Sequence, residues 1–453
     1  MTVGELVTRR LRAAPDLPAA LSALAAALDD APAAVAGDVT RIEVPLNTGV
    51  AALDLPAGLP AGVLEPRMLL GSTWSGAGAA LEREVAGPAE LTAPPPPLRG
   101  AVTVRFDPAR TPDAAWEPFG RCRMWVPALE LDTGRDVIAI NLGDGVDRDA
   151  LRRALTDWRR PTAADGHAPL PVSWTADPGD HDTWCDAVEA ALARIAGPDG
   201  RVPLEKIVLA RRIDGRLDRD VDPARLLRAG APGSTGWPWW IERDGQAWLG
   251  ETPELLGERE GRHLRTVALA GTRPRGGTPA EDARLADDLL ASDKDRREQL
   301  AVATWLGRQL ASLGAVEPTA GPRELRRLPS LQHLGSDHEV AVPGALADAT
   351  WIDALHPTPA LCGAPRAEVR RWLREVEPFD RGLYGGVVGW LAHDRSVLHV
   401  AIRGLQLRGR RISIYAGAGL VRGSDPRREW QETAAKVAAV CHRLGLAAQE
   451  VAS

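Results

Sequence analysis

Lysine is almost absent from this chain. Among its 55 lysine and arginine residues, only Lys206, Lys294 and Lys436 are lysine. Arginine keeps its proton at any biological pH, whereas a lysine in a desolvated pocket can lose its proton and act as a base. Because arginine supplies nearly all of the positive charge, the three lysines mark positions where that difference can matter.

Cysteine is also scarce, and long apolar runs are missing. The four cysteines form no CxxC pair, which argues against a zinc site or a disulfide framework and fits a reducing compartment. No run approaches the roughly 18 apolar residues of a membrane span. The apolar stretch that Asp16 and Asp29 bracket reads as a surface helix rather than a targeting segment. With a formal net charge of −6, we expect a cytoplasmic protein that binds neither nucleic acid nor a membrane.

The pattern along the chain predicts an α+β fold with a large antiparallel sheet. A polar, Pro/Gly/Asp-rich stretch at 161–182 predicts a boundary between an N-terminal half, 1–175, and a C-terminal half, 176–453. Short apolar runs in the first half predict strands with few helices. In the second half, strands are expected at 206–213, 266–271, 385–392, 396–407 and 411–421, and helices at 278–314, 364–376 and 425–445. Strands grouped in this way, with helices between the groups, favour α+β.

Acidic residues share helix faces with two of the lysines. In the helix expected at 278–314, Glu298 lies four residues after Lys294. In the helix at 425–445, Glu429, Glu432 and Lys436 lie on one face. Two helices that each present carboxylates could hold a hard cation such as Mg²⁺. The alternative to a metal site is that these residues form ion pairs on two helix faces that are exposed to solvent.

Three further features could serve chemistry or be ordinary loop structure. Gly417 and Gly419 come near the end of an expected strand, where bare backbone lets N–H groups approach an anion. Thr272 lies in a tight glycine-bounded turn. Glu254 follows a proline between apolar residues, a setting that raises a carboxyl pKa and suits a general acid. Lys206 itself heads an apolar strand and could be either a buried base or an edge residue that reaches solvent.

Taken together, these stretches resemble one family, the chorismate-utilising enzymes, and within it the isochorismate synthases. The resemblance covers most of 200–440 and is carried by nine ordered stretches: "KIVLARR" (206–212), "LGETPELL" (249–256), "ALAGTRPRG" (268–276), "LLASDKDRRE" (289–298), "QHLGS" (332–336), "ALHPTPALCGAPR" (354–366), "EPFDRGLYGGVVGW" (377–390), "VAIRG" (400–404) and "YAGAGLVRGSDPRREWQETAAK" (415–436). The family fold implied is a sandwich of two large antiparallel sheets with helices outside, to which the N-terminal half contributes strands.

The resemblance implies a role for each candidate residue. Lys206 would activate water for attack at C2 of chorismate, and Glu254 would protonate the departing C4 hydroxyl. Mg²⁺ would be held by Glu298 and Glu432, with Glu429 close by, and would bind the ring carboxylate. The implied substrate-binding residues are Thr272, His333, Ala360, Leu361, Tyr384, Arg403, Gly417, Gly419 and Lys436.

The branch within the family follows from two positions. Branches that use ammonia lack a lysine at the position of Lys206 and work with a glutamine amidotransferase, so no such partner is expected. Salicylate synthases typically have threonine where this chain has Ala360. We therefore expect a monomeric, Mg²⁺-dependent isomerase that makes isochorismate for menaquinone or catechol siderophore synthesis. The alternatives are a salicylate synthase, an anthranilate or aminodeoxychorismate synthase-like enzyme, and an inactive chorismate-binding homologue.

Three departures from the family pattern concern the site. Gln299 stands where the family usually has histidine after the metal glutamate, and Thr252 replaces a serine in the acid loop. The stretch 335–340 also looks irregular against the family pattern after Ser336, which leaves its pocket contacts open.

Overall fold

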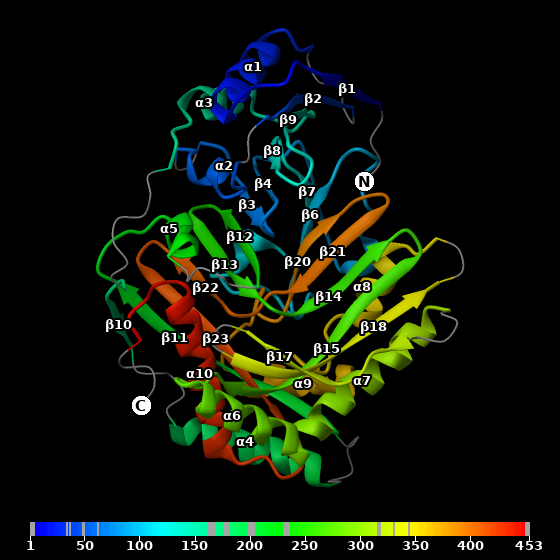
Figure 1. Cartoon of the computed structure of the whole chain (residues 1–453), viewed down its shortest axis with the longest axis vertical. Coiled ribbons are helices and arrows are strands. Elements are labelled where there is room, and N and C mark those ends of the chain that lie inside the picture. Colours follow the sequence, from blue (N-terminus) through cyan, green and yellow to red (C-terminus); the bar gives the residue numbers. More distant parts are fainter. Residues whose placement is uncertain are drawn as a thin grey trace.

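Two large β-sheets with helices on their outer sides make up the chain (Figure 1). The computed structural model describes residues 5–32, 35, 38–47, 50–60, 63–161, 169–175, 181–197, 204–229, 236–314, 319–328, 331–342 and 345–448. In these residues every strand pairing is antiparallel except that of β1 with β2. The predicted fold class, two antiparallel sheets with helices outside, is confirmed.

The larger sheet has 13 strands, in the order β1-β2-β9-β8-β4-β3-β12-β13-β22-β23-β11-β10, with β19 also paired to β11. Their bounds are β1 Leu6–Arg10, β2 Val39–Pro45, β3 Arg67–Leu70, β4 Trp74–Ala77, β8 Leu129–Asp132, β9 Val137–Leu142, β10 Val172–Trp174, β11 Lys206–Leu217, β12 Trp237–Arg243, β13 Gln246–Thr252, β19 Gly363–Ala364, β22 Gly404–Arg408 and β23 Arg411–Leu420.

The smaller sheet has 10 strands, in the order β16-β18-β15-β14-β21-β20-β6-β7-β5, with β17 also paired to β18. Their bounds are β5 Leu81–Val85, β6 Gly100–Val104, β7 Cys122–Val126, β14 Leu255–Glu260, β15 His263–Pro274, β16 Thr319–Ala320, β17 Glu324–Arg327, β18 Leu331–Ala341, β20 Val387–Leu391 and β21 Arg395–Val400. The stretch 335–340, whose sequence departs from the family pattern, is regular strand within β18. Its residues pair in register with β15.

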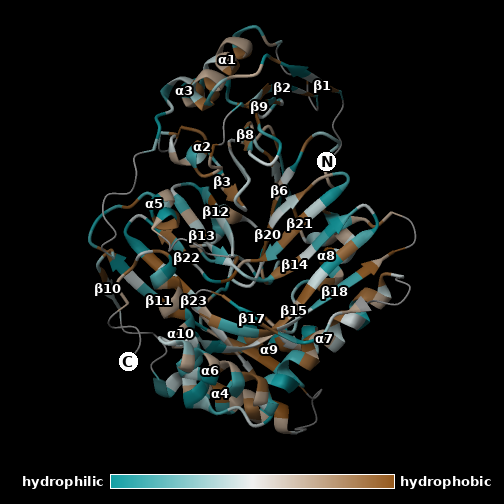
Figure 2. Cartoon of the chain, viewed as in Figure 1, coloured by the Kyte–Doolittle hydropathy of each residue, from teal (hydrophilic) through white to brown (hydrophobic). Residues whose placement is uncertain are grey.

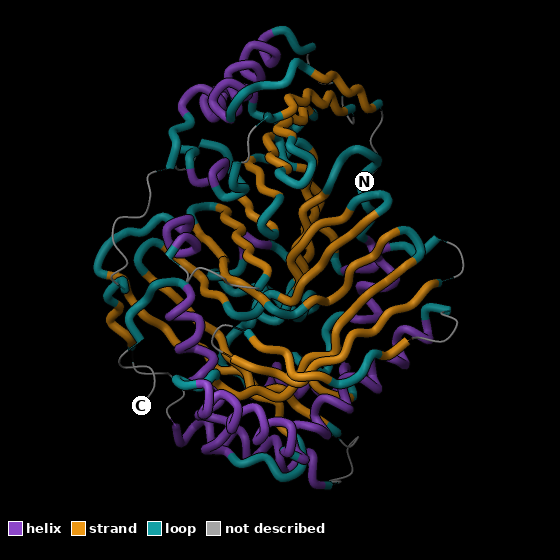
Figure 3. The backbone as a smooth tube through the Cα atoms, in the orientation of Figure 1, coloured by secondary structure: helices purple, strands orange, loops and turns teal. Residues whose placement is uncertain are grey.

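Helices cover the outer faces of the sheets (Figure 3). Their bounds are α1 Leu17–Asp29, α2 Asp54–Ala57, α3 Arg148–Asp157, α4 His181–Ala196, α5 Pro223–Arg228, α6 Pro279–Ala291, α7 Asp293–Ser312, α8 Asp348–Leu355, α9 Arg366–Val376 and α10 Pro426–Arg443, with 3-10 turns at Pro88–Glu90 and Glu117–Phe119. Both α4 and α7 carry hydrophobic and hydrophilic stretches (Figure 2), as expected for helices with one face against a sheet. No helix in the described part of the chain is long and apolar enough to cross a membrane.

Two expected elements are each divided in the structure. The single helix expected at 278–314 is two helices, α6 and α7, because Ser292 has an extended backbone and its side chain accepts the N–H of Asp295, which begins a new helix. The single strand expected at 396–407 is also two, β21 and β22, which belong to different sheets. Between them Arg403 has a φ of 61°, a left-handed conformation that no strand can continue through.

Apolar side chains fill the space between the sheets. One core cluster joins tryptophans of the larger sheet to residues of the smaller one, including Trp74, Trp239, Trp248, Val388 and Trp390. Strands from before and after the predicted boundary occur in both sheets, since β3 pairs with β12 and β6 pairs with β20. Much of the predicted boundary, including 176–180, lies outside the described residues.

Candidate active site

The floor of the site is the ladder between β11 and β23. In this ladder Val208 faces Gly419 and Ala210 faces Gly417. A Cβ on Gly419 would lie 2.1 Å from Glu298 Oε1, and one on Gly417 would lie 3.0 Å from the Tyr384 hydroxyl. The two glycines were predicted to expose backbone to an anion. In the structure they also make room for side chains that reach over β23.

Each of the three lysines pairs with a different glutamate. The Nζ atom of Lys206 lies 2.8 Å from Glu298 Oε1, and Lys206 is only 1% exposed. In the same way, Lys294 Nζ lies 2.7 Å from Glu429 Oε1, and Lys436 Nζ lies 2.8 Å from Glu432 Oε1. Lys436 also donates to the carbonyl of Gly417, at 2.7 Å. The glutamates are those predicted as metal ligands, and Lys206 is a buried residue rather than a solvent-reaching edge residue.

The pKa values of the two carboxyl groups of α10, Glu429 and Glu432, shift in opposite directions. Burial raises the pKa of Glu429, against the attraction of Lys294. Burial would also raise the pKa of Glu432, but Lys436 and Lys294 outweigh it and lower that pKa. Burial opposes a charge on Lys294, yet Glu432, Glu298 and Glu429 together raise its pKa. The cluster therefore keeps positive charge beside Glu432.

Glu254 lies in the two-residue link between β13 and β14. Its backbone N–H donates to Thr252 Oγ1 at 3.1 Å, and its carbonyl accepts from Val400 at 2.9 Å. Threonine in place of serine therefore still supplies the hydroxyl that holds this loop. Burial raises the pKa of Glu254 to about 7, against the lowering effect of Lys206 and Arg403. A carboxyl group with this pKa is protonated often enough at neutral pH to donate a proton.

A bulge at Gly271 in β15 brings Thr272 and His333 together. Gly271 has a φ of 77°, and the register with β18 shifts at this point. His333 Nδ1 lies 3.0 Å from the carbonyl of Gly271 and 3.1 Å from Thr272 Oγ1. That carbonyl can only accept, which assigns the ring proton to Nδ1 and leaves Nε2, a buried atom without a partner, as an acceptor. Burial lowers the pKa of His333 to about 3, so the ring is neutral.

Arg403 and Tyr384 supply polar groups without partners. No side chain or carbonyl in the described part of the chain forms a hydrogen bond or ion pair with the guanidinium of Arg403. Burial lowers its pKa to about 10, so it keeps its charge at neutral pH. Burial also raises the pKa of Tyr384 to about 12, and the ring stacks on Tyr415 with centroids 5.5 Å apart. A guanidinium in this setting is a binding group for an anion.

One pocket collects nearly all the predicted site residues. It is lined by Glu254, Thr272, Glu298, His333, Ala360, Leu361, Tyr384, Arg403, Gly417, Gly419, Glu432 and Lys436. Lys206 lies behind its wall against Glu298, and Glu429 lines a neighbouring cavity of about 500 Å³ that shares Thr272 and Glu432. Sequence reasoning missed the lining residues Val208, Ile402 and Tyr415. For Val208 a signal existed, because it shares a strand face with Lys206.

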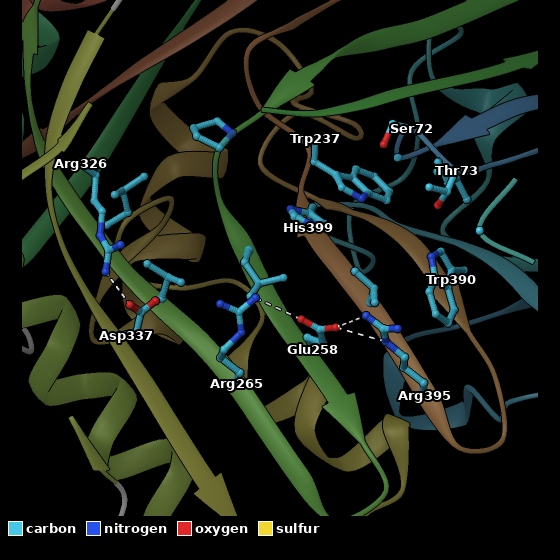
Figure 4. A pocket seen from close by; sticks show the side chains of 18 of the residues that line it. Ser72, Thr73, Trp237, Glu258, Arg265, Arg326, Asp337, Trp390, Arg395 and His399 are labelled. Atoms are coloured by element: carbon cyan, nitrogen blue, oxygen red, sulfur yellow. Dashed lines mark hydrogen bonds and ion pairs between the residues drawn. The ribbon is translucent and has the colours of Figure 1, made fainter. Parts of the chain in front are cut away.

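A larger cavity, about 830 Å³, adjoins this pocket through Pro253, Leu269 and His333 but holds none of the predicted acids or lysines. Several of its charges are already paired with one another. Figure 4 shows Glu258 between Arg265 and Arg395, and Arg326 reaching Asp337. We therefore place the chemistry in the smaller pocket, which is lined by the acid Glu254, by Lys436 and by Arg403, whose guanidinium has no partner among the described residues.

The carboxylates have the donor chemistry of a magnesium site. Glu298, Glu429 and Glu432 offer oxygen ligands of the kind Mg²⁺ prefers, and Glu429 Oε2 is buried without a partner. Within the described residues, however, no three acidic, histidine or cysteine side chains are arranged to hold a metal ion. Each glutamate turns to its lysine instead. The residue types fit a hard cation.

Gln299, which stands where the family usually has histidine, joins a chain of hydrogen-bonded side chains. Its Nε2 donates to Ser336 Oγ at 3.0 Å, and that hydroxyl lies 3.0 Å from His338 Nε2. The contact ties α7 to β18 just behind the pocket.

Comparisons with known proteins point to one family. A family model described as "Chorismate binding enzyme" matches residues 88–445. Isochorismate synthase 2 of Arabidopsis thaliana, a chloroplastic protein, is 31% identical over 77% of this chain, and the match spans 64% of that relative. Isochorismate synthase DhbC of Bacillus subtilis is 38% identical over 58% of this chain and 67% of its own length.

Among solved structures, MenF, the menaquinone-specific isochorismate synthase of Escherichia coli, matches with a TM-score of 0.76 and 26% identity. The match covers 94% of this chain and 99% of MenF. The anthranilate synthase component I of Streptococcus pneumoniae has a TM-score of 0.60 at 19% identity, a likeness of fold alone.

Replacing Glu254 by glutamine should change how stability depends on pH. With a folded-state pKa of about 7, above the roughly 4.3 of an exposed glutamate, the folded wild type binds a proton that the unfolded chain releases. This stabilisation is complete below about pH 4.3 and is lost as pH rises through about 7. Relative to wild type, Glu254→Gln should therefore gain about 3 kcal/mol between pH 4 and pH 8. Urea unfolding at a series of pH values measures this difference, and exposed Glu375→Gln is the control. Parallel curves for wild type and Glu254→Gln would contradict the assignment.

Proposed function

The chain belongs to the chorismate binding enzyme family, and we propose that it is a Mg²⁺-dependent isochorismate synthase. The observation that carries the proposal is the unpaired guanidinium of Arg403, in one pocket with an acid whose pKa burial raises to about 7 and next to a buried lysine. Chorismate carries two carboxylates, and such a pocket suits an anion on which acid and base act together.

Binding would begin with two groups that have no hydrogen-bond partner among the described residues. Arg403 and the Tyr384 hydroxyl would hold one substrate carboxylate, and Lys436 would lie beside the other with the backbone of Gly417 and Gly419. Thr272 and His333 would close the opposite wall, and Ala360 and Leu361 would line the ring. Mg²⁺ bound by Glu298 and Glu432, with Glu429 close by, would fix the ring carboxylate and reduce the negative charge of the acidic cluster.

The reaction would need one proton accepted and one delivered. Lys206 in its neutral form would take a proton from water as the water oxygen bonds to C2. The ring double bonds would shift, and the C4 hydroxyl would leave as water with a proton from Glu254. One water enters and one leaves, so the net result is an isomerisation.

Two residues favour this branch of the family. Lys206 is the lysine that the ammonia-using branches lack, and the pocket position next to Leu361 is the small Ala360, not the threonine typical of salicylate synthases. Action without an amidotransferase, the monomeric state and the cytoplasmic location remain expectations from the sequence. Whether the product feeds menaquinone or siderophore synthesis depends on the enzyme that consumes it.

The first test is the identity of the product. Purified protein with chorismate and Mg²⁺ should yield isochorismate in equilibrium with chorismate, separated by chromatography. No pyruvate should be released, and added ammonia should have no effect. Stoichiometric pyruvate would place the protein in the salicylate branch, and an aminated product would exclude both readings.

The second test concerns the metal. Glu298→Gln and Glu432→Gln should each weaken Mg²⁺ binding, measured by calorimetry, by at least about tenfold, since each removes a charged oxygen ligand. Chelation should abolish turnover, and Mg²⁺ should restore it. Asp293→Asn is the control, because Asp293 begins α7, the helix that contains Glu298, but its side chain is 81% exposed. Unchanged Mg²⁺ affinity in both glutamine variants would refute the ligand assignment.

The third test separates the charge of Lys206 from its ability to lose a proton. Lys206→Arg keeps a positive charge beside Glu298 but cannot act as a base, so it should lose roughly 10²–10⁴-fold in kcat, as severely as Lys206→Ala. Thermal unfolding of both variants shows whether they are folded. If Lys206→Arg instead kept much of its activity while Lys206→Ala did not, charge alone would be the requirement.

A further inference from the structure

Arg381, in the link between α9 and β20, connects three separate segments around the pocket. It is 3% exposed. Its Nη1 donates to the carbonyl of Leu361 at 2.9 Å, and its Nη2 donates to the carbonyl of Val208 at 2.6 Å. Its Nε donates to Glu377 Oε2 at 2.7 Å, and Nη2 also contacts the other oxygen of the same carboxylate. A single guanidinium thus holds a strand, a loop and a helix end.

Glu377 and Arg381 supply hydrogen-bond partners to a part of β11 that has no neighbouring strand on one edge. On this edge β19 pairs only with residues 206–207, and β10 pairs only with 215–217. Between them, the carbonyl of Val208 accepts from Arg381 and the N–H of Ala210 donates to Glu377 Oε1 at 2.9 Å. Buried backbone groups need such partners. Here two side chains take the place of a strand.

The segments held in this way form part of the pocket wall. Val208 and Leu361 both line the pocket, and Lys206 precedes Val208 by two residues on the same strand face. The N–H of Val208 donates to the carbonyl of Cys362 at 2.9 Å, so strand and loop are joined directly as well. The guanidinium therefore adds a second connection between β11 and the Ala360-Leu361 loop.

We propose that Arg381 is a positioning residue that fixes the distance between the Lys206 strand and the Ala360-Leu361 loop for turnover of chorismate. The proposal rests on the proposed function. Arginine suits the task because its planar fork presents five N–H donors in fixed directions, whereas lysine presents three on a flexible stem. Lysine at this position keeps the charge beside Glu377 but cannot reach both carbonyls and both carboxylate oxygens together.

Arg259 provides a matched control. It is 4% exposed and forms a two-point ion pair with Asp348, at 2.7 and 3.1 Å. It also donates to the carbonyl of Ala392 at 2.9 Å, but it lines neither the pocket nor the cavities beside it. Arg259→Lys therefore disturbs a buried guanidinium network of similar chemistry away from the substrate.

The experiment compares chorismate consumption by wild type, Arg381→Lys and Arg259→Lys at a temperature where thermal unfolding shows all three folded. Arg381→Lys should lose about 10–100-fold in kcat relative to Arg259→Lys, the scale expected of a misplacement of about 1 Å. KM should change less than about threefold, because Arg403 is held by other strands. Equal kcat values for the two variants would overturn the proposal.

Glu377→Gln keeps the result decisive if Arg381→Lys does not fold. It removes the charge that orients the guanidinium but keeps an oxygen that can accept from the N–H of Ala210. As in Arg381→Lys, kcat should therefore fall and KM should change little. A wild-type kcat in this variant would overturn the proposal. The product of the wild type is identified separately. A product other than isochorismate would refute the proposed function, and consumption of chorismate by the variants would still decide the role of Arg381.

Discussion

Buried carboxylates require buried cations, and this requirement organises the centre of the molecule. Lys206 of β11 pairs with Glu298 of α7, and Lys294 of α7 pairs with Glu429 of α10. Lys436 of α10 then donates to a carbonyl of β23, which is the ladder partner of β11. The contacts form a closed circuit through two helices and two strands. Removing one member of a buried pair typically costs about 3–5 kcal/mol, because the other charge is left alone.

The same rule distinguishes the two adjoining cavities. In the larger one, Glu258 and Asp337 already neutralise neighbouring arginines. In the smaller one, the guanidinium of Arg403 has no such partner among the described residues. A ligand that brings its own negative charge is therefore favoured in the smaller pocket, and a neutral ligand would leave a buried cation uncompensated. Cavity size alone would have favoured the larger one.

Sequence reasoning succeeded where local chemistry is strong. The lysine scarcity singled out Lys206, which is buried against Glu298, and the helix expected at 425–445 is α10, Pro426–Arg443. It failed where one residue changes the chain direction. Arg403 adopts a left-handed backbone that divides an expected strand between two sheets, and Ser292 divides an expected helix. Arg381 was missed because nothing in an arginine-rich sequence separates a guanidinium that bridges three segments from one that lies in solvent. That distinction depends on contacts between residues far apart in the chain.

The order of strands in the sheets also determines when each edge finds its partner during synthesis on the ribosome. Strands β3 and β6 emerge early, but their outer neighbours are β12 and β20, which begin at residues 237 and 387. Until then the nascent chain carries two open strand edges, the kind of surface that pairs readily with another chain. Pairings across such long separations also slow folding. Of the two edges, that of β6 stays unpaired through more of synthesis, because β20 follows β12 in the chain. Pairing of the nascent chain with another chain is therefore most favoured at β6.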